Sequence, residues 1–306
     1  MGMNRAVITP SSDLPLHLQR LLTASSGLHQ GRYVGRFAPT PSGPLHLGNL
    51  RTALLSWLMA RREGGIWLLR IDDLDTPRLR AGAVLSALDD LRWLGLHWDG
   101  PVVLQSQRRG LYNAVLSHLR RSGLLYACRC SRRQLGGVAI YPGTCRELGL
   151  AWGWQHNRLP AWRLRVRGQA CASCGDVVVR RADGFIAYHL ASAVDELAFG
   201  ITEVVRGADL APVRWAQEAV MAALGQSPPA YRHVPLLCDA GGEKLAKREG
   251  SAGLKPWRDQ GATPADVVGS LAQGLHLVPA RTALSAQELL ARMSSRPQAL
   301  DACLHS

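Results

Sequence analysis

The chain has 306 residues, enough to bury one large or two modest hydrophobic cores. Lys and Arg number 36 against 23 Asp and Glu, which gives a formal net charge of +13. Such an excess favours a polyanionic partner such as RNA, DNA or a membrane surface, and charge alone does not choose among them. Because no run of 18 apolar residues occurs, no membrane-spanning helix is expected.

Seven cysteines without a regular framework argue against a secreted disulfide scaffold and favour a reducing compartment, so a cytoplasmic protein is expected. Residues 1–34 contain no apolar core followed by a small-residue cleavage site, so no secretory signal is expected. Residues 1–32 contain prolines, serines and glycines and are expected to form a loosely ordered extension.

The first predicted unit is residues 33–62, YVGRFAPTPSGPLHLGNLRTALLSWLMARR. Its opening apolar run predicts a buried strand, the prolines and glycine at 39–44 predict a tight turn, and the leucines then recur at helical spacing. His46, Gly48 and Asn49 fall in the first turn of that helix, and a helix N-terminus suits a phosphate. On spacing alone, an ordinary βα unit with a surface histidine is the simpler interpretation.

Apolar runs and helical patterns continue to alternate along the chain. Ile66 to Ile71 predicts a second buried strand, and helices are predicted near residues 84–95 and 107–122. This alternation predicts an α/β fold, a doubly wound parallel nucleotide-binding domain with ligands at the carboxyl ends of its strands. The side chains expected near such ends are Arg36, His46 and Asp72.

Three cysteines and a tyrosine gather within 18 residues, at Cys128, Cys130, Tyr141 and Cys145. Zinc prefers four ligands of this kind, so a metal site is predicted, with free buried cysteines as the alternative. A second pair, Cys171 and Cys174, has the spacing of half a metal site but no partner pair, and it is left out of the predicted site.

Asp183-Gly184 lies between two β-rich runs and predicts a hairpin over residues 177–189. Further strands are predicted at residues 201–205, with Arg206 at the carboxyl end, and at residues 231–237. A helix is predicted to open at Pro212 between these two strands.

A glycine-led basic loop follows, and its Lys244 and Lys247 are spaced to wrap a triphosphate, with a solvated basic turn as the alternative. Only 58 residues follow Arg248. Thr263 before a proline and a capping box at Ser285 each predict the start of a helix in this tail.

The string RFAPTPSGPLHLGN resembles the signature of the class I aminoacyl-tRNA synthetases, most closely their glutamyl/glutaminyl branch. His46-Leu-Gly-Asn49 stands in place of the family's HIGH tetrad, and KLAKR at 244–248 in place of its KMSKS loop, with Ala246 at the serine position. DGFIAYHLASAVDE and GITEVVRGADL resemble the second half of the same domain, and the cysteine spacing resembles a zinc knuckle of this branch. The resemblance covers roughly residues 33–250.

The resemblance implies a catalytic Rossmann domain in two halves, residues 33–123 and 185–250, with a zinc-binding, acceptor-type insertion at 124–184 and a helical tail at 251–306. This tail is too short for the anticodon-binding domain of full-length glutamyl- or glutaminyl-tRNA synthetases. A short paralogue is therefore implied, which activates glutamate with ATP and attaches it to queuosine in the anticodon loop of tRNA(Asp).

The resemblance also implies the roles of individual residues. ATP, accompanied by Mg²⁺, would be bound by His46, Gly48, Asn49 and Lys247, and His46, Lys244 and Lys247 would serve catalysis. Asp72 stands where the family usually carries Glu. The residues implied for glutamate are Arg36, Phe37, Ala38, Pro39, Thr40, Asp72, Tyr188 and Arg206, and those implied for Zn²⁺ are Cys128, Cys130, Tyr141 and Cys145.

Two other functions stay open at this point. One is a truncated glutamyl-tRNA synthetase that charges a tRNA 3′ end, and the other is an inactive paralogue that binds RNA. A surface ion pair remains the plainer role for Arg36, and a core position in a strand the plainer role for Tyr188. A monomer is expected.

Overall fold

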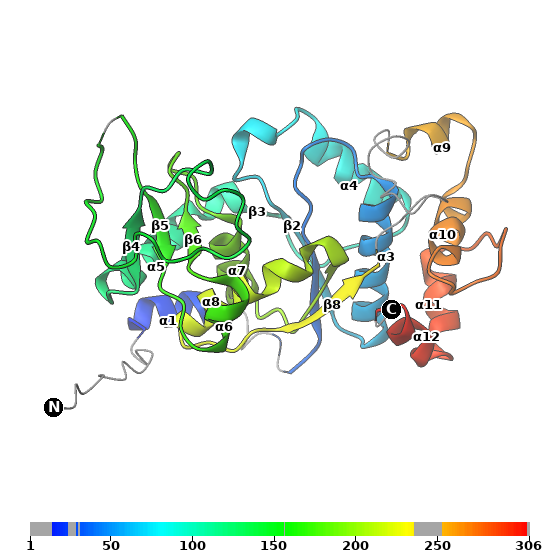
Figure 1. Cartoon of the computed structure of the whole chain (residues 1–306). Coiled ribbons are helices and arrows are strands. Elements are labelled where there is room, and N and C mark those ends of the chain that lie inside the picture. Colours follow the sequence, from blue (N-terminus) through cyan, green and yellow to red (C-terminus); the bar gives the residue numbers. More distant parts are fainter. Residues whose placement is uncertain (1–13, 24–28, 30, 156, 236–252, 305–306) are drawn as a thin grey trace. The chain divides into compact units, whose positions relative to one another are not determined.

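The computed structural model describes residues 14–23, 29, 31–155, 157–235 and 253–304 (Figure 1). Lys244 and Lys247 lie outside the described residues, as does the end of the strand predicted at 231–237. The chain divides into two compact units, which are described separately. None of the described helices is long and apolar enough to cross a membrane.

The first unit comprises His29–Ser106, Ile201–Ala211 and Pro229–Ser306 and is built on parallel strands. Strand β1 (Val34–Phe37) pairs in parallel with β2 (Ile66–Ile71), and β2 pairs in parallel with β3 (Val103–Leu104). Strand β7 (Glu203–Gly207) pairs in parallel with β8 (Ala230–Val234). Parallel pairing confirms the α/β prediction for this unit and brings the carboxyl ends of its strands to one edge.

Helix α3 (Leu47–Arg62) is the centre of this unit and packs on β1, β2 and β7. Ten of its residues are buried, and eight of them are consecutive, from Ala53 to Ala60, so the helix is covered on all sides and not on one face alone. The buried Ser56 hydroxyl donates to the Arg36 carbonyl oxygen at 3.0 Å, which ties the helix to β1.

Three further helices of this unit end or begin where the sequence predicted. Helix α4 (Ala83–Trp93) is followed by Gly95 at φ 74°, a left-handed conformation that favours glycine. Helices α10 (Pro264–Gln273) and α11 (Ala286–Ser294) begin at capping boxes and pack on α3. The shorter helices are η1 (Thr76–Arg78), α9 (Lys255–Asp259) and α12 (Pro297–Ala302).

The second unit comprises Met1–Leu28, Gln107–Gly200 and Pro212–Pro228. Its sheet is antiparallel, with strands β4 (Leu125–Cys128), β5 (Ala161–Leu164) and β6 (Val177–Arg180) in that order. All three strands lie within residues 124–184, the range predicted as an insertion in the parallel domain. Its helices are α5 (Arg109–Arg121), α6 (Gln169–Cys174), α7 (Tyr188–Ala198) and α8 (Arg214–Ala223), with η2 (Gln105–Arg108) before α5 and η3 (Ala208–Val213) before α8.

The predicted hairpin around Asp183-Gly184 is only half correct. The turn forms, with Gly184 at φ 89° and its N–H donating to the Arg181 carbonyl oxygen at 3.0 Å. The returning arm makes a single bridge at Ile186 and then enters α7, so Tyr188 lies in a helix rather than a strand. An alanine- and leucine-rich run after the bridge favours the helix over strand pairing.

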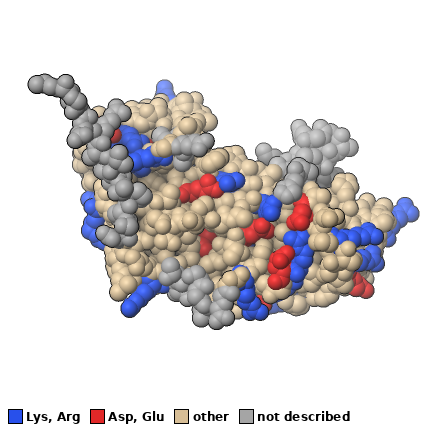
Figure 2. All heavy atoms as spheres, turned by 90° about the horizontal axis from the view of Figure 1, so that it is seen from below, with Lys and Arg blue, Asp and Glu red and all other residues tan. Residues whose placement is uncertain are grey.

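Residues 16–23 form helix α1 (Leu16–Thr23), which packs on α7 and buries Leu18 and Leu22. The expectation of a loosely ordered extension is therefore wrong for these eight residues. On the face drawn in Figure 2, Asp and Glu atoms lie beside Lys and Arg atoms, so this face does not carry one uninterrupted basic patch.

Candidate active site and metal centre

His46 caps the N-terminus of α3. Its Nδ1 accepts the backbone N–H of Asn49 at 3.2 Å, while the Asn49 Oδ1 accepts the backbone N–H of His46 at 3.3 Å. Because Nδ1 is an acceptor, the neutral ring carries its proton on Nε2, and Nε2 is the atom that can donate to an anion. The cap also fixes the orientation of the ring relative to the N–H groups of the first helical turn.

Gly48 keeps room for that ring. A Cβ atom at position 48 would lie 3.0 Å from both Cε1 and Nδ1 of His46, closer than ordinary van der Waals contact. A side chain here would therefore push the imidazole away from its capping position. Gly48 therefore has a structural role in the His46 cap in addition to the role in ATP binding that the resemblance implies.

The turn between β1 and α3 is fastened to the end of β2. The Pro39 carbonyl oxygen accepts the backbone N–H of Asp72 at 3.0 Å, and the Pro41 carbonyl oxygen accepts that of Arg80 at 3.0 Å. Phe37 is buried and stacks on Trp67, with ring centroids 6.3 Å apart. Phe37 is thus a core residue, and the residues after it are held at the carboxyl edge of the strands.

Two buried guanidinium groups come from neighbouring strands. The Arg36 Nη1 donates to the Val205 carbonyl oxygen at 3.3 Å, and Arg36 is only 5% exposed. Arg206 is 3% exposed and its guanidinium lies 4.6 Å from the ring centroid of Tyr231. Burial argues against the surface ion pair for Arg36, and the fork of donors on each guanidinium group suits a carboxylate.

Asp72 follows β2 and forms an ion pair with Arg70, which was not among the predicted site residues. The Arg70 Nε lies 2.7 Å from one carboxylate oxygen of Asp72, and Nη2 lies 3.2 Å from the other. Both side chains are buried. Residues two apart in a strand share a face, which is the pattern that could have revealed this pair.

Tyr188 belongs to the second unit, in the first turn of α7, where its ring meets that of His189 edge to face with centroids 6.0 Å apart. It is half-buried. The structure therefore brings Arg36, Asp72, Arg206 and His46 into one unit and places Tyr188 in the other.

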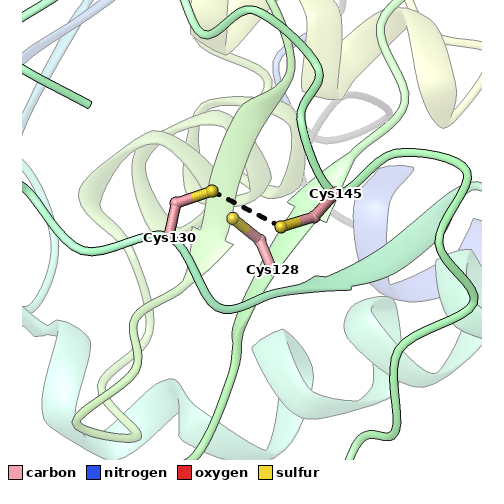
Figure 3. Close-up of side chains that lie close together, drawn as sticks. All are labelled: Cys128, Cys130 and Cys145. Carbon is pink, nitrogen blue, oxygen red and sulfur yellow. Dashed lines mark hydrogen bonds between the residues drawn. The ribbon is translucent and has the colours of Figure 1, made fainter. Parts of the chain in front are cut away.

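The four predicted metal ligands do come together. The Sγ atoms of Cys128, Cys130 and Cys145 lie within 4.8 Å of one another, and Figure 3 shows them pointing toward a common centre. The Sγ atoms of Cys130 and Cys145 are 3.4 Å apart. The Tyr141 hydroxyl lies 3.4 Å from the Cys128 sulfur and 3.6 Å from the Cys130 sulfur.

These residues fit a tetrahedral zinc ion. Zinc–sulfur bonds of about 2.3 Å place the sulfur atoms of a tetrahedral site about 3.8 Å apart, close to the spacing found here. Three soft sulfur donors favour zinc over the hard cations, which prefer oxygen. With Tyr141 as a fourth donor the site would be closed, which is typical of a structural zinc rather than a catalytic one.

Electrostatics around the cluster differ from one thiol to the next. Burial raises the pKa of Cys130 even though a hydrogen bond with Tyr141 acts in the opposite direction. Burial also opposes ionisation of Cys145, but hydrogen bonds from the Arg129 backbone and from Tyr141 outweigh it and lower the pKa of that thiol. The lowered pKa of Cys145 favours its thiolate, which is the form of a cysteine that binds a metal.

Arginines support the cluster from outside. The Arg163 guanidinium lies 3.6 Å from the centroid of the Tyr141 ring, and its Nη1 donates to the Asp176 carbonyl oxygen at 2.6 Å. Arg158 donates to the Cys130 carbonyl oxygen at 3.1 Å. Composition gave no signal for these contacts, because they join residues far apart in the sequence.

Most of the chain matches one family of known proteins. Residues 33–138 and 156–295 match the family described as tRNA synthetases class I (E and Q), catalytic domain. The chain belongs to this family. The family resemblance inferred from the string at residues 36–49 is therefore confirmed, and so is a ligase of the aminoacyl-tRNA synthetase type that uses ATP.

Two relatives match nearly the whole chain. It is 61% identical over 292 residues to the glutamyl-Q tRNA(Asp) synthetase of Synechococcus sp., which covers 95% of this chain and 99% of that protein. It is 57% identical over 301 residues to the protein of the same name from Prochlorococcus marinus, with 96% and 98% covered.

A solved structure supports the fold. The glutamate-tRNA synthetase of Elizabethkingia anophelis superposes with a TM-score of 0.70 at 25% identity. This alignment covers 85% of the present chain and 65% of that chain. The chain therefore spans about two thirds of that longer synthetase but almost the full length of the relatives above.

Proposed function

We propose that the protein activates L-glutamate with ATP and transfers it to the queuosine base in the anticodon loop of tRNA(Asp). The observation that carries this proposal is the 61% identity with a glutamyl-Q tRNA(Asp) synthetase over 99% of that protein's length. Identity of this extent supports the same substrates. The catalytic-domain match at residues 33–138 and 156–295 supports the same chemistry.

Activation forms a bond between a carboxylate oxygen of glutamate and the α-phosphorus of ATP, and the bond to pyrophosphate breaks. The enzyme forms no covalent intermediate, so it works by positioning and by stabilising charge. His46, through Nε2, and the N–H groups of α3 near Gly48 and Asn49 would bind the phosphates. Mg²⁺ bound with ATP would offset phosphate charge.

Lys247, assisted by Lys244, would neutralise the negative charge that builds on the departing pyrophosphate. In the second step an acceptor group of the modified base attacks the activated carbonyl carbon, and AMP leaves. The proton released by the acceptor passes to a base or to solvent. Both steps need the amino acid held still, because a small displacement slows such reactions strongly.

Glutamate would be held by the guanidinium groups of Arg36 and Arg206, one for each carboxylate. The backbone at residues 38–40 would line the pocket, and Tyr188 would contribute its hydroxyl. Asp72 would face the amino group of glutamate, with Arg70 setting the direction of its carboxylate. Pairing with Arg70 leaves less negative charge for that amine than an unpaired carboxylate would supply.

Zn²⁺ would be held by Cys128, Cys130, Tyr141 and Cys145 and would stabilise the insertion at residues 124–184. The catalytic halves would be residues 33–123 and 185–250, and residues 251–306 would form the tail. A reducing cytoplasm fits thiols that must stay available for a metal. We expect the enzyme to work as a monomer.

Glutamate-dependent exchange of pyrophosphate into ATP tests the first step. Exchange is expected with glutamate and little with glutamine or aspartate. A glutamine side chain would leave a guanidinium facing a neutral amide, a loss on the order of 2–4 kcal/mol when buried. Equal exchange with glutamine would reject the assignment of glutamate.

A pair of RNA substrates tests the second step. tRNA(Asp) without its 3′ terminal nucleotides is expected to accept labelled glutamate, whereas the same tRNA without queuosine is expected not to. The opposite result would mean that the protein charges the 3′ end, as a shortened glutamyl-tRNA synthetase would. Binding of RNA without any exchange would favour an inactive paralogue.

A further inference from the structure

The segment of the second unit that carries the cysteine cluster is strongly basic. Residues 120–167 contain ten arginines, no lysine and one acidic residue, Glu147. Five of these arginines are exposed: Arg120, Arg121, Arg132, Arg133 and Arg167. A surface of this charge attracts a polyanion, and its attraction for phosphates depends on salt and not on base sequence.

A small hairpin projects from this region. Gln155 and Arg158 exchange two backbone hydrogen bonds, each 3.1 Å long, and Asn157 has φ 53°, which is typical of a tight turn. Residues 139–155 fall between the two ranges that match the family, so the segment that enters this turn is not part of the shared catalytic pattern.

The hairpin is held to the cysteine cluster by two arginines. Arg129 donates to the carbonyl oxygens of Ala151 at 3.1 Å, Gly153 at 2.6 Å and Arg158 at 3.0 Å. Arg158 in turn donates to the Cys130 carbonyl oxygen at 3.1 Å. Four hydrogen bonds to charged donors make the backbone on both sides of the turn rigid.

Trp154 stands on this rigid backbone and is 69% exposed. The neighbouring Trp152 is packed, edge to face with Trp162 at 5.1 Å and with Arg120 4.3 Å from its ring centroid. Within the described part of the chain, Trp154 makes no such ring or cation contact. A large aromatic face is thus presented to solvent on a backbone that Arg129 already orders, one residue from a carbonyl oxygen to which Arg129 donates.

We propose that Trp154 stacks on an unpaired base of the RNA substrate while exposed arginines of the same segment, Arg120 beside Trp152 among them, bind phosphates of that RNA. An aromatic face beside positive charge is the usual means of binding single-stranded RNA, because every base has a stacking face. This proposal rests on the proposed function, since it adds a contact to the RNA that would receive glutamate. Trp154 is assigned to binding and not to the reacting atoms.

Binding to two RNA probes tests the proposal. One is the anticodon stem-loop of tRNA(Asp), and the other is a blunt RNA duplex with the same number of phosphates and no unpaired base. Trp154→Ala should weaken stem-loop binding roughly 10-fold and leave duplex binding unchanged. Trp154→Phe should restore most of the stem-loop affinity, because it keeps an aromatic face.

Trp215→Ala is the matched control, since Trp215 is also exposed in the same unit but lies on α8 beside Arg214. It should leave both affinities unchanged. Unaltered stem-loop binding in Trp154→Ala would overturn the proposal. An equal loss for the duplex, or an equal effect of Trp215→Ala, would also overturn it, because either result would indicate altered folding or charge.

The proposed function is tested separately by glutamate-dependent exchange in the parent protein. If glutamate-dependent exchange is absent while stem-loop binding still depends on Trp154, the proposed function is rejected and the proposed RNA contact is supported. If exchange is present while Trp154→Ala binds the stem-loop normally, the function stands and the surface is rejected.

Discussion

The guanidinium group of Arg70 donates a hydrogen bond to each carboxylate oxygen of Asp72, from Nε at 2.7 Å and from Nη2 at 3.2 Å. Both side chains are buried at the carboxyl end of β2. Asp72 is therefore held in one orientation by its neighbour in the chain. Removing one partner of a buried ion pair strongly lowers the free energy of unfolding, because the charge of the other partner stays buried without compensation.

Asp72→Asn should lower the free energy of unfolding by about 3 kcal/mol, measured by urea denaturation at pH 7. Asp75→Asn is the matched control, because the partner of Asp75, Arg78, has a side chain that is 68% exposed. The control should change stability by less than about 1 kcal/mol. Equal effects of the two substitutions would show that the buried pair is no stronger than a surface pair.

His46→Asn should separate the two roles of His46. Asn is a strong N-cap residue, so this variant should keep the stability of α3, whereas His46→Ala should lose about 1 kcal/mol through loss of the cap. Both variants lack the Nε2 donor, so both should slow glutamate-dependent exchange about 100-fold. Normal exchange in the Asn variant would mean that the ring serves only as a cap.

Cys145→Ser should remove zinc from a protein purified without added metal, as measured by elemental analysis. Tyr141→Phe should lower zinc affinity and keep the ring that Arg163 covers. Cys174→Ser is the control, because Cys174 lies outside the three-sulfur cluster. One zinc per chain, held as tightly in Cys145→Ser as in the parent, would contradict the ligand assignment.

Asp90 should make stability fall as the pH rises. Burial raises its pKa from 3.8 to about 6, although the charge of Arg258 acts in the opposite direction and Asp89 adds to the rise. Between pH 4 and 6 the folded state then binds more protons than the unfolded chain, so a rise in pH lowers the free energy of unfolding. Asp90→Asn removes this dependence.

The stability of the parent minus that of Asp90→Asn should therefore decrease between pH 4 and pH 7, by an amount on the order of 1–3 kcal/mol. Urea denaturation of both proteins at pH 4, 5, 6 and 7 measures it. Parallel pH profiles would show that Asp90 titrates alike in the folded and unfolded states.

Patterns that depend on near neighbours were readable from the sequence. The largely apolar run Ile66 to Ile71 is strand β2 with the predicted bounds. The capping boxes at Thr263 and Ser285 start α10 and α11, because each cap is satisfied by a residue three positions away. The cluster of Cys128, Cys130, Tyr141 and Cys145 was also predicted, because their close spacing in the sequence limits the ways in which their side chains can meet.

Contacts between distant segments were not readable. Strand β5 is four residues long and pairs with β4 across a long loop, so its antiparallel register has no local signal. Arg129 donates to the carbonyl oxygens of Ala151 and Gly153 beside Trp154. Every residue has a backbone carbonyl, so the sequence cannot indicate which ones accept these hydrogen bonds. Residues 185–189 include Phe, Ile and Tyr, which favour strands, but in the structure Tyr188 is the start of a helix.

The position of α1 has a consequence for the order of folding during synthesis. Its buried Leu18 and Leu22 pack in a unit whose partner helix, α7, begins only at Tyr188. At about 5–20 residues per second, roughly 8 to 33 seconds pass between translation of α1 and translation of α7. Helix α5 (Arg109–Arg121) also contacts α1 and is translated earlier, so for that time the two leucines lack part of their native cover, and this apolar segment would suit a ribosome-bound chaperone.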